Sequence, residues 1–150
     1  MEHPLTDQLL VENFEPENSA LRIAVVSETW PPEVNGVALT LSKLIVQLSQ
    51  RQHTIQLIRP RQDKHDTASQ QTAWSEILLR GLPIPNYPQL KLGFPSKKQL
   101  IKAWTIKRPD LVHIATEGPL GWSALRAAKV LRLPVTSDFR TNFHSYSRHY

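Results

Sequence analysis

The amino-acid sequence predicts an α/β fold, a doubly wound parallel sheet of the Rossmann-like kind. Short apolar runs typical of buried strands alternate with segments of helical periodicity, and this alternation is typical of parallel sheets. A length of 150 residues with 40% hydrophobic residues suits one domain with a single sizeable core. We expect residues 21–150 to form this domain. Residues 1–20 are polar and acidic without a sustained period, which indicates a flexible leader.

The first predicted elements are a buried strand, indicated by an apolar run, and a helix, indicated by the spacing of its apolar residues. The run LRIAVVS, residues 21–27, has the unbroken apolar character of a strand buried on both faces. A helix is predicted from about residue 36 to residue 51, because its apolar residues fall on one face. Those residues are Val37, Leu41, Leu44, Ile45 and Leu48. The runs HTIQLIRP and SEILLRG, residues 53–60 and 75–81, are then predicted to be the second and third strands.

The second half of the chain continues the alternation after a proline-rich segment. Four prolines in GLPIPNYPQLKLGFP, residues 81–95, indicate an extended, ordered loop without regular pairing. A helix at 96–108, a strand at 110–116, a helix at 119–132 and a strand at 134–139 are predicted beyond it. The alternation of helices and parallel strands is therefore predicted to continue through residue 139.

The loop after the first strand, SETWPPEVNGV, occupies the place where ligands bind in such folds. Ligands gather at the carboxyl ends of parallel strands, and the first loop commonly brings a helix N-terminus to a phosphate. Asn35 can cap that helix, and Gly36 has no Cβ to hinder an approaching phosphate. An ordinary Asn-Gly turn explains the same residues, because the dinucleotide fingerprint GxGxxG is absent.

Four segments together carry a resemblance to a known family. They are PPEVNGVALTLSKL, PIPNYPQLKLGFPS, DLVHIATEGPLGWSALRAAK and LPVTSDFRTNFHSYSRHY, in this order. They resemble signature segments of the retaining GT-B glycosyltransferases of family four. The resemblance implies that the chain is the N-terminal, acceptor-side half of a GT-B fold, truncated and without the C-terminal nucleotide-sugar domain.

The implied reaction is transfer of a sugar, with retention, from a UDP- or GDP-linked donor to a lipid or other hydroxyl acceptor. The nearest subgroup acts in glycolipid biosynthesis and contains mannosyl-, sulfoquinovosyl- and diacylglycerol glycosyltransferases. The nucleotide sugar is a substrate, so neither a cofactor nor a metal is expected. The 150-residue chain alone is expected to be inactive, because the donor-binding half has no counterpart in it.

The resemblance also points to residues that bind the donor. Gly36 matches a glycine whose amide approaches the donor phosphate, and Asn35 and Val37 shape that turn. Glu117 and Gly118 match the EGPLG turn at the end of a later strand, and Glu117 is a candidate catalytic residue. An acidic residue before a helix is equally expected on structural grounds, because it complements the helix dipole.

Arg140 and His144 are the other candidate catalytic residues. Many family members have a histidine near the sugar at the position of Arg140. Arginine stays protonated and cannot act as a general base, so Arg140 would instead clamp a phosphate or the acceptor. His144 lies four residues further on, and an ordinary surface position explains it equally well.

The helix predicted at 96–108 allows two interpretations. Leu100, Ile101 and Trp104 share one face and Lys98 and Lys102 another, which would suit an anionic membrane surface. A crossover helix packed on the sheet, with its lysines in water, is the alternative.

We expect His113 to be a hydrogen-bonded histidine of the core. The tryptophans at 30, 74 and 122 could stack on a sugar or fill the core.

Composition leaves competing functions open. The net charge of +5 allows acidic partners. An NADP-dependent reductase module could bind the 2′-phosphate through Arg59 and Arg61, but only one of the three expected glycines is present. A non-catalytic fragment is another alternative. The basic residues are dispersed and match no nucleic-acid motif, so no nucleic-acid partner is expected.

The absence of cysteine and of long apolar stretches indicates a cytoplasmic protein, with the inner face of the plasma membrane as a peripheral location.

Overall fold

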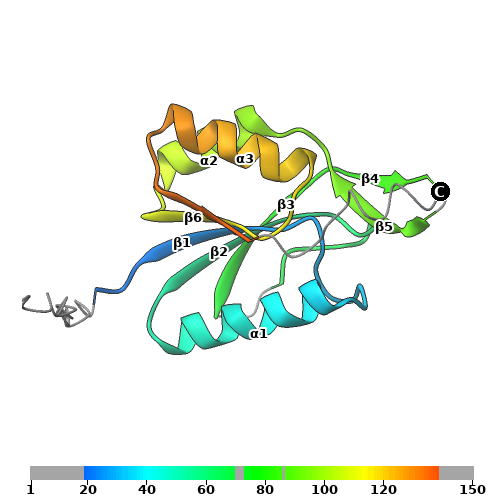
Figure 1. Cartoon of the computed structure of the whole chain (residues 1–150), viewed down its shortest axis with the longest axis horizontal. Coiled ribbons are helices and arrows are strands. Elements are labelled where there is room, and N and C mark those ends of the chain that lie inside the picture. The colour runs from blue at the N-terminus through cyan, green and yellow to red at the C-terminus, as the bar shows by residue number, and fades with distance from the viewer. Residues whose placement is uncertain (1–18, 70–72, 86, 139–150) are drawn as a thin grey trace, which may run out of the picture.

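The computed structural model describes residues 19–69, 73–85 and 87–138, which form the layered domain of Figure 1. The elements in chain order are β1 (Arg22–Val26), α1 (Gly36–Gln50), β2 (Thr54–Pro60), β3 (Trp74–Leu79), β4 (Gly81–Ile84), β5 (Tyr87–Gly93), α2 (Lys97–Ile106), β6 (Leu111–Ile114), α3 (Pro119–Val130) and β7 (Val135–Ser137). Every helix and strand predicted outside the proline-rich segment is confirmed, with small differences at the ends.

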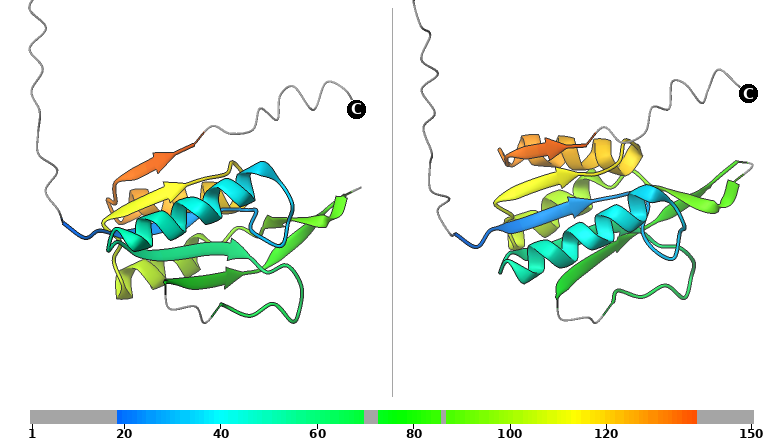
Figure 2. Two further views of the ribbon diagram at one scale, coloured as in Figure 1. Left: turned by 90° about the horizontal axis from the view of Figure 1, so that it is seen from below. Right: turned by 60° about the horizontal axis from the view of Figure 1, so that its bottom comes forward.

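Five strands form a parallel sheet in the order β3-β2-β1-β6-β7. Figures 1 and 2 show α1 on one face of this sheet and α2 with α3 on the other. The predicted fold class, a doubly wound Rossmann-like sheet, is therefore confirmed. Because all five strands run the same way, the loops after β1, β2, β3 and β6 meet at one edge of the sheet.

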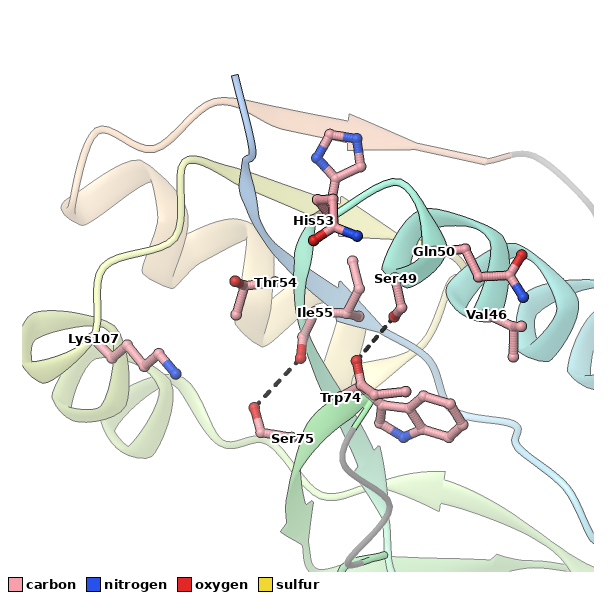
Figure 3. Close-up of a pocket in the computed structure, with 11 residues that line it drawn as sticks. Val46, Ser49, Gln50, His53, Thr54, Ile55, Trp74, Ser75 and Lys107 are labelled. Carbon is pink, nitrogen blue, oxygen red and sulfur yellow. Dashed lines mark hydrogen bonds between the residues drawn. The ribbon is translucent and has the colours of Figure 1, made fainter. Parts of the chain in front are cut away.

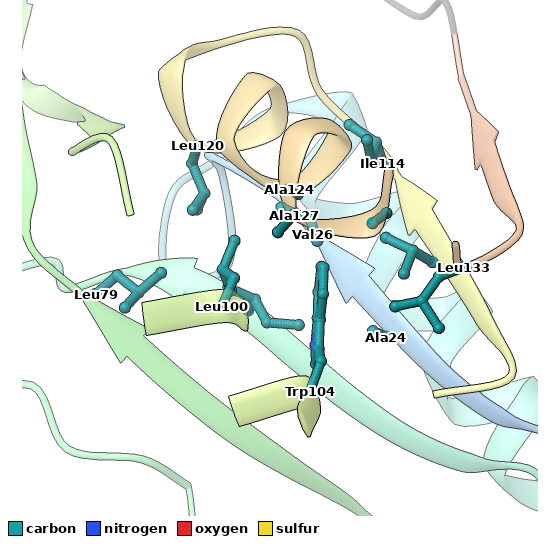
Figure 4. Close-up of a cluster of buried hydrophobic side chains, with 13 residues drawn as sticks. Ala24, Val26, Leu79, Leu100, Trp104, Ile114, Leu120, Ala124, Ala127 and Leu133 are labelled. Atoms are coloured by element: carbon teal, nitrogen blue, oxygen red, sulfur yellow. The ribbon is translucent and has the colours of Figure 1, made fainter. Parts of the chain in front are cut away.

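The sheet separates two apolar cores. Leu100 and Trp104 of α2 and several alanines of α3 pack on one face, against Ala24 and Val26 of β1 (Figure 4). On the other face, Leu41 and Ile45 of α1 pack against alternate residues of β1 and β2. Strand β1 is thus buried on both faces, as its unbroken apolar run predicts.

The proline-rich segment is paired, so the prediction of an unpaired extended loop is wrong. Strands β4 and β5 form an antiparallel two-stranded sheet with a register shift between Pro83 and Ile84. Both strands of such a ribbon are edge strands, and a proline is tolerated at an edge or beside a bulge because its missing N–H breaks no bond of the ladder. The hairpin projects beyond the carboxyl edge of the main sheet (Figures 1 and 2).

Helix α2 is a crossover helix packed on the sheet. Leu100 and Trp104 are fully buried, and the Trp104 indole Nε1 donates to Gln56 Oε1 at 3.1 Å. The core uses this apolar face, as the crossover-helix interpretation predicts. Lys98 and Lys102 remain exposed on the opposite face. In the described ranges, no helix has the length and apolarity needed to cross a bilayer.

Candidate functional site

The candidate site lies at the carboxyl edge of the sheet, where the loops after β1 and β6 meet. The Ala115 amide donates to the Val26 carbonyl at 2.9 Å, and the Glu28 amide donates to Thr116 Oγ1 at 2.8 Å. These bonds join the two loops just beyond their strands. The structure thereby brings the two predicted turns, Asn35–Val37 and Glu117–Gly118, to the same edge.

The loop after β1 is held by side-chain hydrogen bonds that end at the start of α1. Asn35 caps the helix, because its Oδ1 accepts from the Ala38 amide at 2.8 Å. Its Nδ2 donates to Thr29 Oγ1 at 2.7 Å, and Thr29 Oγ1 donates to Glu33 Oε2 at 2.5 Å. The capping role predicted for Asn35 is confirmed. The irregular loop therefore orients the N-terminus of α1.

Gly36, the first residue of α1, has open space beside it. A Cβ built at this position would meet no heavy atom within 4 Å, and its φ is not in the left-handed region. Neither the backbone conformation nor packing within the described residues requires a glycine here. No acceptor within the described ranges bonds the amides of Gly36 and Val37, which lie at the positive end of the helix dipole.

Glu28 is a buried carboxylate in the middle of this edge. Its side chain accepts bonds from the amides of Gly93, of Leu120 at 2.8 Å and of Gly121 at 3.3 Å. Only 5% of the residue is exposed. Burial raises the pKa of Glu28 above its usual value, although the three backbone hydrogen bonds act in the opposite direction. Glu28 therefore ties the loop after β1 to the end of the hairpin and to the start of α3.

Two glycines leave room for the Glu28 side chain. A Cβ on Gly118 would come within 2.3 Å of Glu28 Oε1, and a Cβ on Gly93 would come within 3.0 Å of Glu28 Oε2 and within 2.4 Å of Leu120 Cβ. The backbone of Gly118 is extended, a conformation open to any residue. Packing against Glu28 thus accounts for the glycine at 118, a position where a ligand-binding role was predicted.

Glu117 and Trp122 line a pocket of about 320 Å³ between α3 and the ends of β6 and β7. Glu117 is exposed, and Trp122 is 63% exposed. The pocket also offers the side chains of Thr116 and Ser137. Trp122 is consequently free to contact a ligand, whereas Trp30 packs edge-on against Trp74 at 6.1 Å in the core on the α1 side.

Arg140 and His144 lie outside the described residues. His113 of β6 is hydrogen-bonded, as predicted, but it is half-buried and belongs to neither apolar core. Its Nδ1 lies 3.0 Å from Thr136 Oγ1, its Nε2 lies 3.3 Å from Asp138 Oδ2, and its side chain is 16% exposed.

Arg59 is buried in an ion-pair cluster. Its guanidinium donates to both carboxylate oxygens of Asp66, at 2.6 and 3.0 Å, and to Glu76 Oε2 at 3.0 Å. The hydrogen bond from Arg59 lowers the pKa of Asp66. Arg59 is therefore not available to a nucleotide 2′-phosphate, which removes one of the two arginines on which the reductase alternative relies.

A cavity of about 720 Å³ lies at the opposite edge of the sheet (Figure 3). It is bounded by the end of α1 and the starts of β2 and β3. Several of its polar groups are already bonded internally: Ser49 Oγ donates to the Ala73 carbonyl at 2.9 Å, and His53 Nδ1 accepts from the Leu21 amide at 3.1 Å. This amino edge is not where parallel sheets bind ligands.

Comparison with known protein families shows to which family the domain belongs. Residues 34–150 match the model of Glycosyltransferase Family 4. The chain belongs to this family. The match begins one residue before Asn35 and includes α1, the hairpin, α2 and the β6–α3 turn.

Curated relatives are glycosyltransferases. The chain is 29% identical over 137 residues to a GDP-mannose-dependent alpha-mannosyltransferase of Mycolicibacterium smegmatis, covering 87% of this chain and 35% of the relative. It is 26% identical over 133 residues to a protein of the same name from Corynebacterium glutamicum, covering 87% and 32%. An alpha-monoglucosyldiacylglycerol synthase of Streptococcus pneumoniae is 26% identical over 129 residues, covering 84% and 28%. The chain spans about a third of the length of these relatives.

Glu28 is the residue of this family 4 domain that motif reasoning missed. The available signal was an acidic residue placed directly after an apolar strand run, where burial is expensive without compensating hydrogen bonds. Its partners lie 65 to 93 residues away in the sequence, so no local pattern identifies them.

Proposed function

We propose that this domain forms the acceptor-side half of a retaining glycosyltransferase that uses a nucleotide-sugar donor and a lipid hydroxyl as acceptor. The observation that carries the proposal is the open N-terminus of α1, capped by Asn35 and unobstructed at Gly36. When the sugar leaves the donor, negative charge grows on the nucleoside diphosphate. Free amides at a helix N-terminus stabilise such charge without reorganising.

The names of the relatives support the choice of substrates. Two are described as GDP-mannose-dependent alpha-mannosyltransferases and one as an alpha-monoglucosyldiacylglycerol synthase. A sulfoquinovosyl transferase of Arabidopsis thaliana is 27% identical over 71 residues. A nucleotide diphosphate sugar and a glycolipid precursor are thus the substrates to test first. Glu117, Arg140 and His144 are proposed to act on the sugar or acceptor, and Gly118 to hold the turn that carries Glu117.

Saturation-transfer NMR on the 150-residue chain tests the donor half of this proposal. We expect weak contact with GDP-mannose or UDP-glucose, with dissociation constants of about 1 mM or weaker, because one wall of a two-domain cleft supplies little binding energy. NADPH and a single-stranded oligonucleotide are the comparison ligands. The same chain should transfer no radiolabelled sugar to mixed lipids. Stronger contact with NADPH than with either nucleotide sugar would contradict the proposal.

The lipid acceptor leads us to propose reversible binding to anionic membranes. Lys98 and Lys102 are exposed on one face of α2, and each lysine near such a surface contributes about 1 kcal/mol. Co-sedimentation with anionic vesicles should weaken with salt and in the variant Lys98→Glu with Lys102→Glu. The control pair Lys43→Glu with Lys129→Glu, on α1 and α3, should bind as the unchanged protein does. Equal partition onto neutral and anionic vesicles would reject membrane binding of this kind.

A further inference from the structure

A second pocket at the carboxyl edge is lined mainly by cations. It has a volume of about 350 Å³ and lies where the loop after β2 faces the base of the hairpin. We call it the basic pocket. Its lining residues are Arg61, Gln62, Asp63, Lys64, Arg80, Gly81 and Lys91.

The four cations of the basic pocket form no close ion pair with a carboxylate of the described residues, although the charge of Arg61 helps to lower the pKa of Asp66. None of them takes part in the salt bridges found in these ranges. Asp63 is the one acidic residue in the lining, and its Oδ1 accepts from the His65 amide at 2.7 Å. The nearby Asp66 carboxylate is bonded to Arg59 and to the Gln62 amide. Like charges gathered in this way repel one another, so an anion entering the pocket would be stabilised.

Two of the cations, Arg61 and Arg80, are held in place by the fold. Arg61 donates from its amide to the Leu79 carbonyl at 2.8 Å and from its guanidinium to the Asp66 carbonyl at 3.1 Å. The Arg80 guanidinium lies 5.3 Å from the centre of the Phe94 ring, a cation–π contact. A Cβ on Gly81 would come within 2.9 Å of the Arg61 carbonyl oxygen, so glycine lets these segments approach closely. Arg61 and Arg80 should therefore lose little side-chain entropy when a ligand binds.

The basic pocket is also connected to the loop that caps α1. Gln62 Nε2 donates to Glu33 Oε1 at 3.0 Å, and the other oxygen of Glu33 accepts from Thr29, which in turn accepts from Asn35. A group bound in the basic pocket therefore lies beside a loop whose position determines the start of α1.

We infer that the basic pocket binds a phosphate ester. This site goes beyond the proposed function and does not depend on it. A phosphate monoester carries close to two negative charges and several acceptor oxygens, so it suits a pocket lined by four cations better than a carboxylate ligand with one charge would. The ester could be a soluble polyol phosphate or the headgroup of a phospholipid.

The test is binding of sn-glycerol 3-phosphate to the 150-residue chain, followed by amide chemical shifts, with phosphatidic acid in phosphatidylcholine vesicles as the second arm. The variant Lys64→Gln with Lys91→Gln changes two cations for which no hydrogen bond or ion pair is found in the described ranges. We expect it to weaken binding about tenfold or more. The control pair Lys43→Gln with Lys129→Gln should stay within about twofold of the unchanged protein.

The arms separate the two sources of the ester. Variant-sensitive binding of glycerol phosphate supports a soluble ester, and variant-sensitive binding of vesicles alone supports a lipid headgroup. Equal binding by the two variant pairs, or no binding in either arm, would overturn the inference. A further outcome separates this inference from the proposed function. If the Lys64→Gln with Lys91→Gln variant binds the ester more weakly but the unchanged chain makes no contact with nucleotide sugars, the phosphate site is supported and the proposed function is rejected.

Discussion

Glu28→Ala should lower the free energy of unfolding by about 3 kcal/mol or more, because it leaves buried amides without their acceptor. Three amides, those of Gly93, Leu120 and Gly121, donate to this one carboxylate. Urea unfolding followed by circular dichroism measures the change. The hairpin and α3 both lose their bond to the loop after β1, so amide exchange at these positions should also accelerate.

Glu117→Ala is the matched control, since Glu117 is an exposed acid next to the same turn. It should change the free energy of unfolding by about 0.5 kcal/mol or less. Glu28→Gln keeps one acceptor oxygen and should be intermediate. An unfolding free energy for Glu28→Ala equal to that of the Glu117 control would show that water replaces the carboxylate without cost.

The pH dependence of stability gives a second test of Glu28. Burial raises its pKa in the folded state above the ordinary value of 4.5. The folded state therefore holds the proton more tightly than the unfolded state. The resulting stabilisation is fully present below the ordinary pKa and is lost as pH rises through the raised pKa. Relative to Glu28→Gln, the unchanged protein should thus gain stability as pH falls from neutrality through the raised pKa toward 4.5. A relative loss over this range would mean that the backbone hydrogen bonds outweigh burial and lower the pKa.

Gly36→Val should reduce turnover of the complete enzyme by about 100-fold or more while leaving the fold intact. No heavy atom lies within 4 Å of the position that a Cβ would occupy, so the side chain fits in the isolated domain. The same space is where the proposed donor phosphate approaches the first amides of α1. A valine there would hold the phosphate away from those amides.

Steady-state kinetics and thermal unfolding of the same preparation check this expectation. Val34→Ala is the control, because Val34 is 93% exposed in the same loop and should tolerate truncation. Gly36→Ala, with a smaller side chain, should be less impaired than Gly36→Val. A Gly36→Val enzyme that folds normally and turns over at the full rate would reject the phosphate-binding role of this loop.

Local sequence patterns were sufficient for the layers of the fold. The apolar run of β1 and the helical spacing of Leu41 and Ile45 are periodic signals that depend only on near neighbours, and both elements form as predicted. The capping role of Asn35 is equally local, because its side chain bonds an amide three residues away. The sequence also predicted that Gly36 would leave the start of the helix unobstructed, and the structure has open space at this position.

The hairpin and the position of Glu28 were decided by tertiary structure. Pro83 lies in a strand because the ribbon has free outer edges and a register shift at this point, a property of the pairing and not of the residue. Glu28 is buried at the centre of the edge because its amide partners come from β5 and α3, 65 and 92 residues away. The local sequence around a glutamate looks the same whether its carboxylate is exposed to water or accepts hydrogen bonds from distant amides. Only the fold brings those amides together, and only their hydrogen bonds offset the desolvation of the charge.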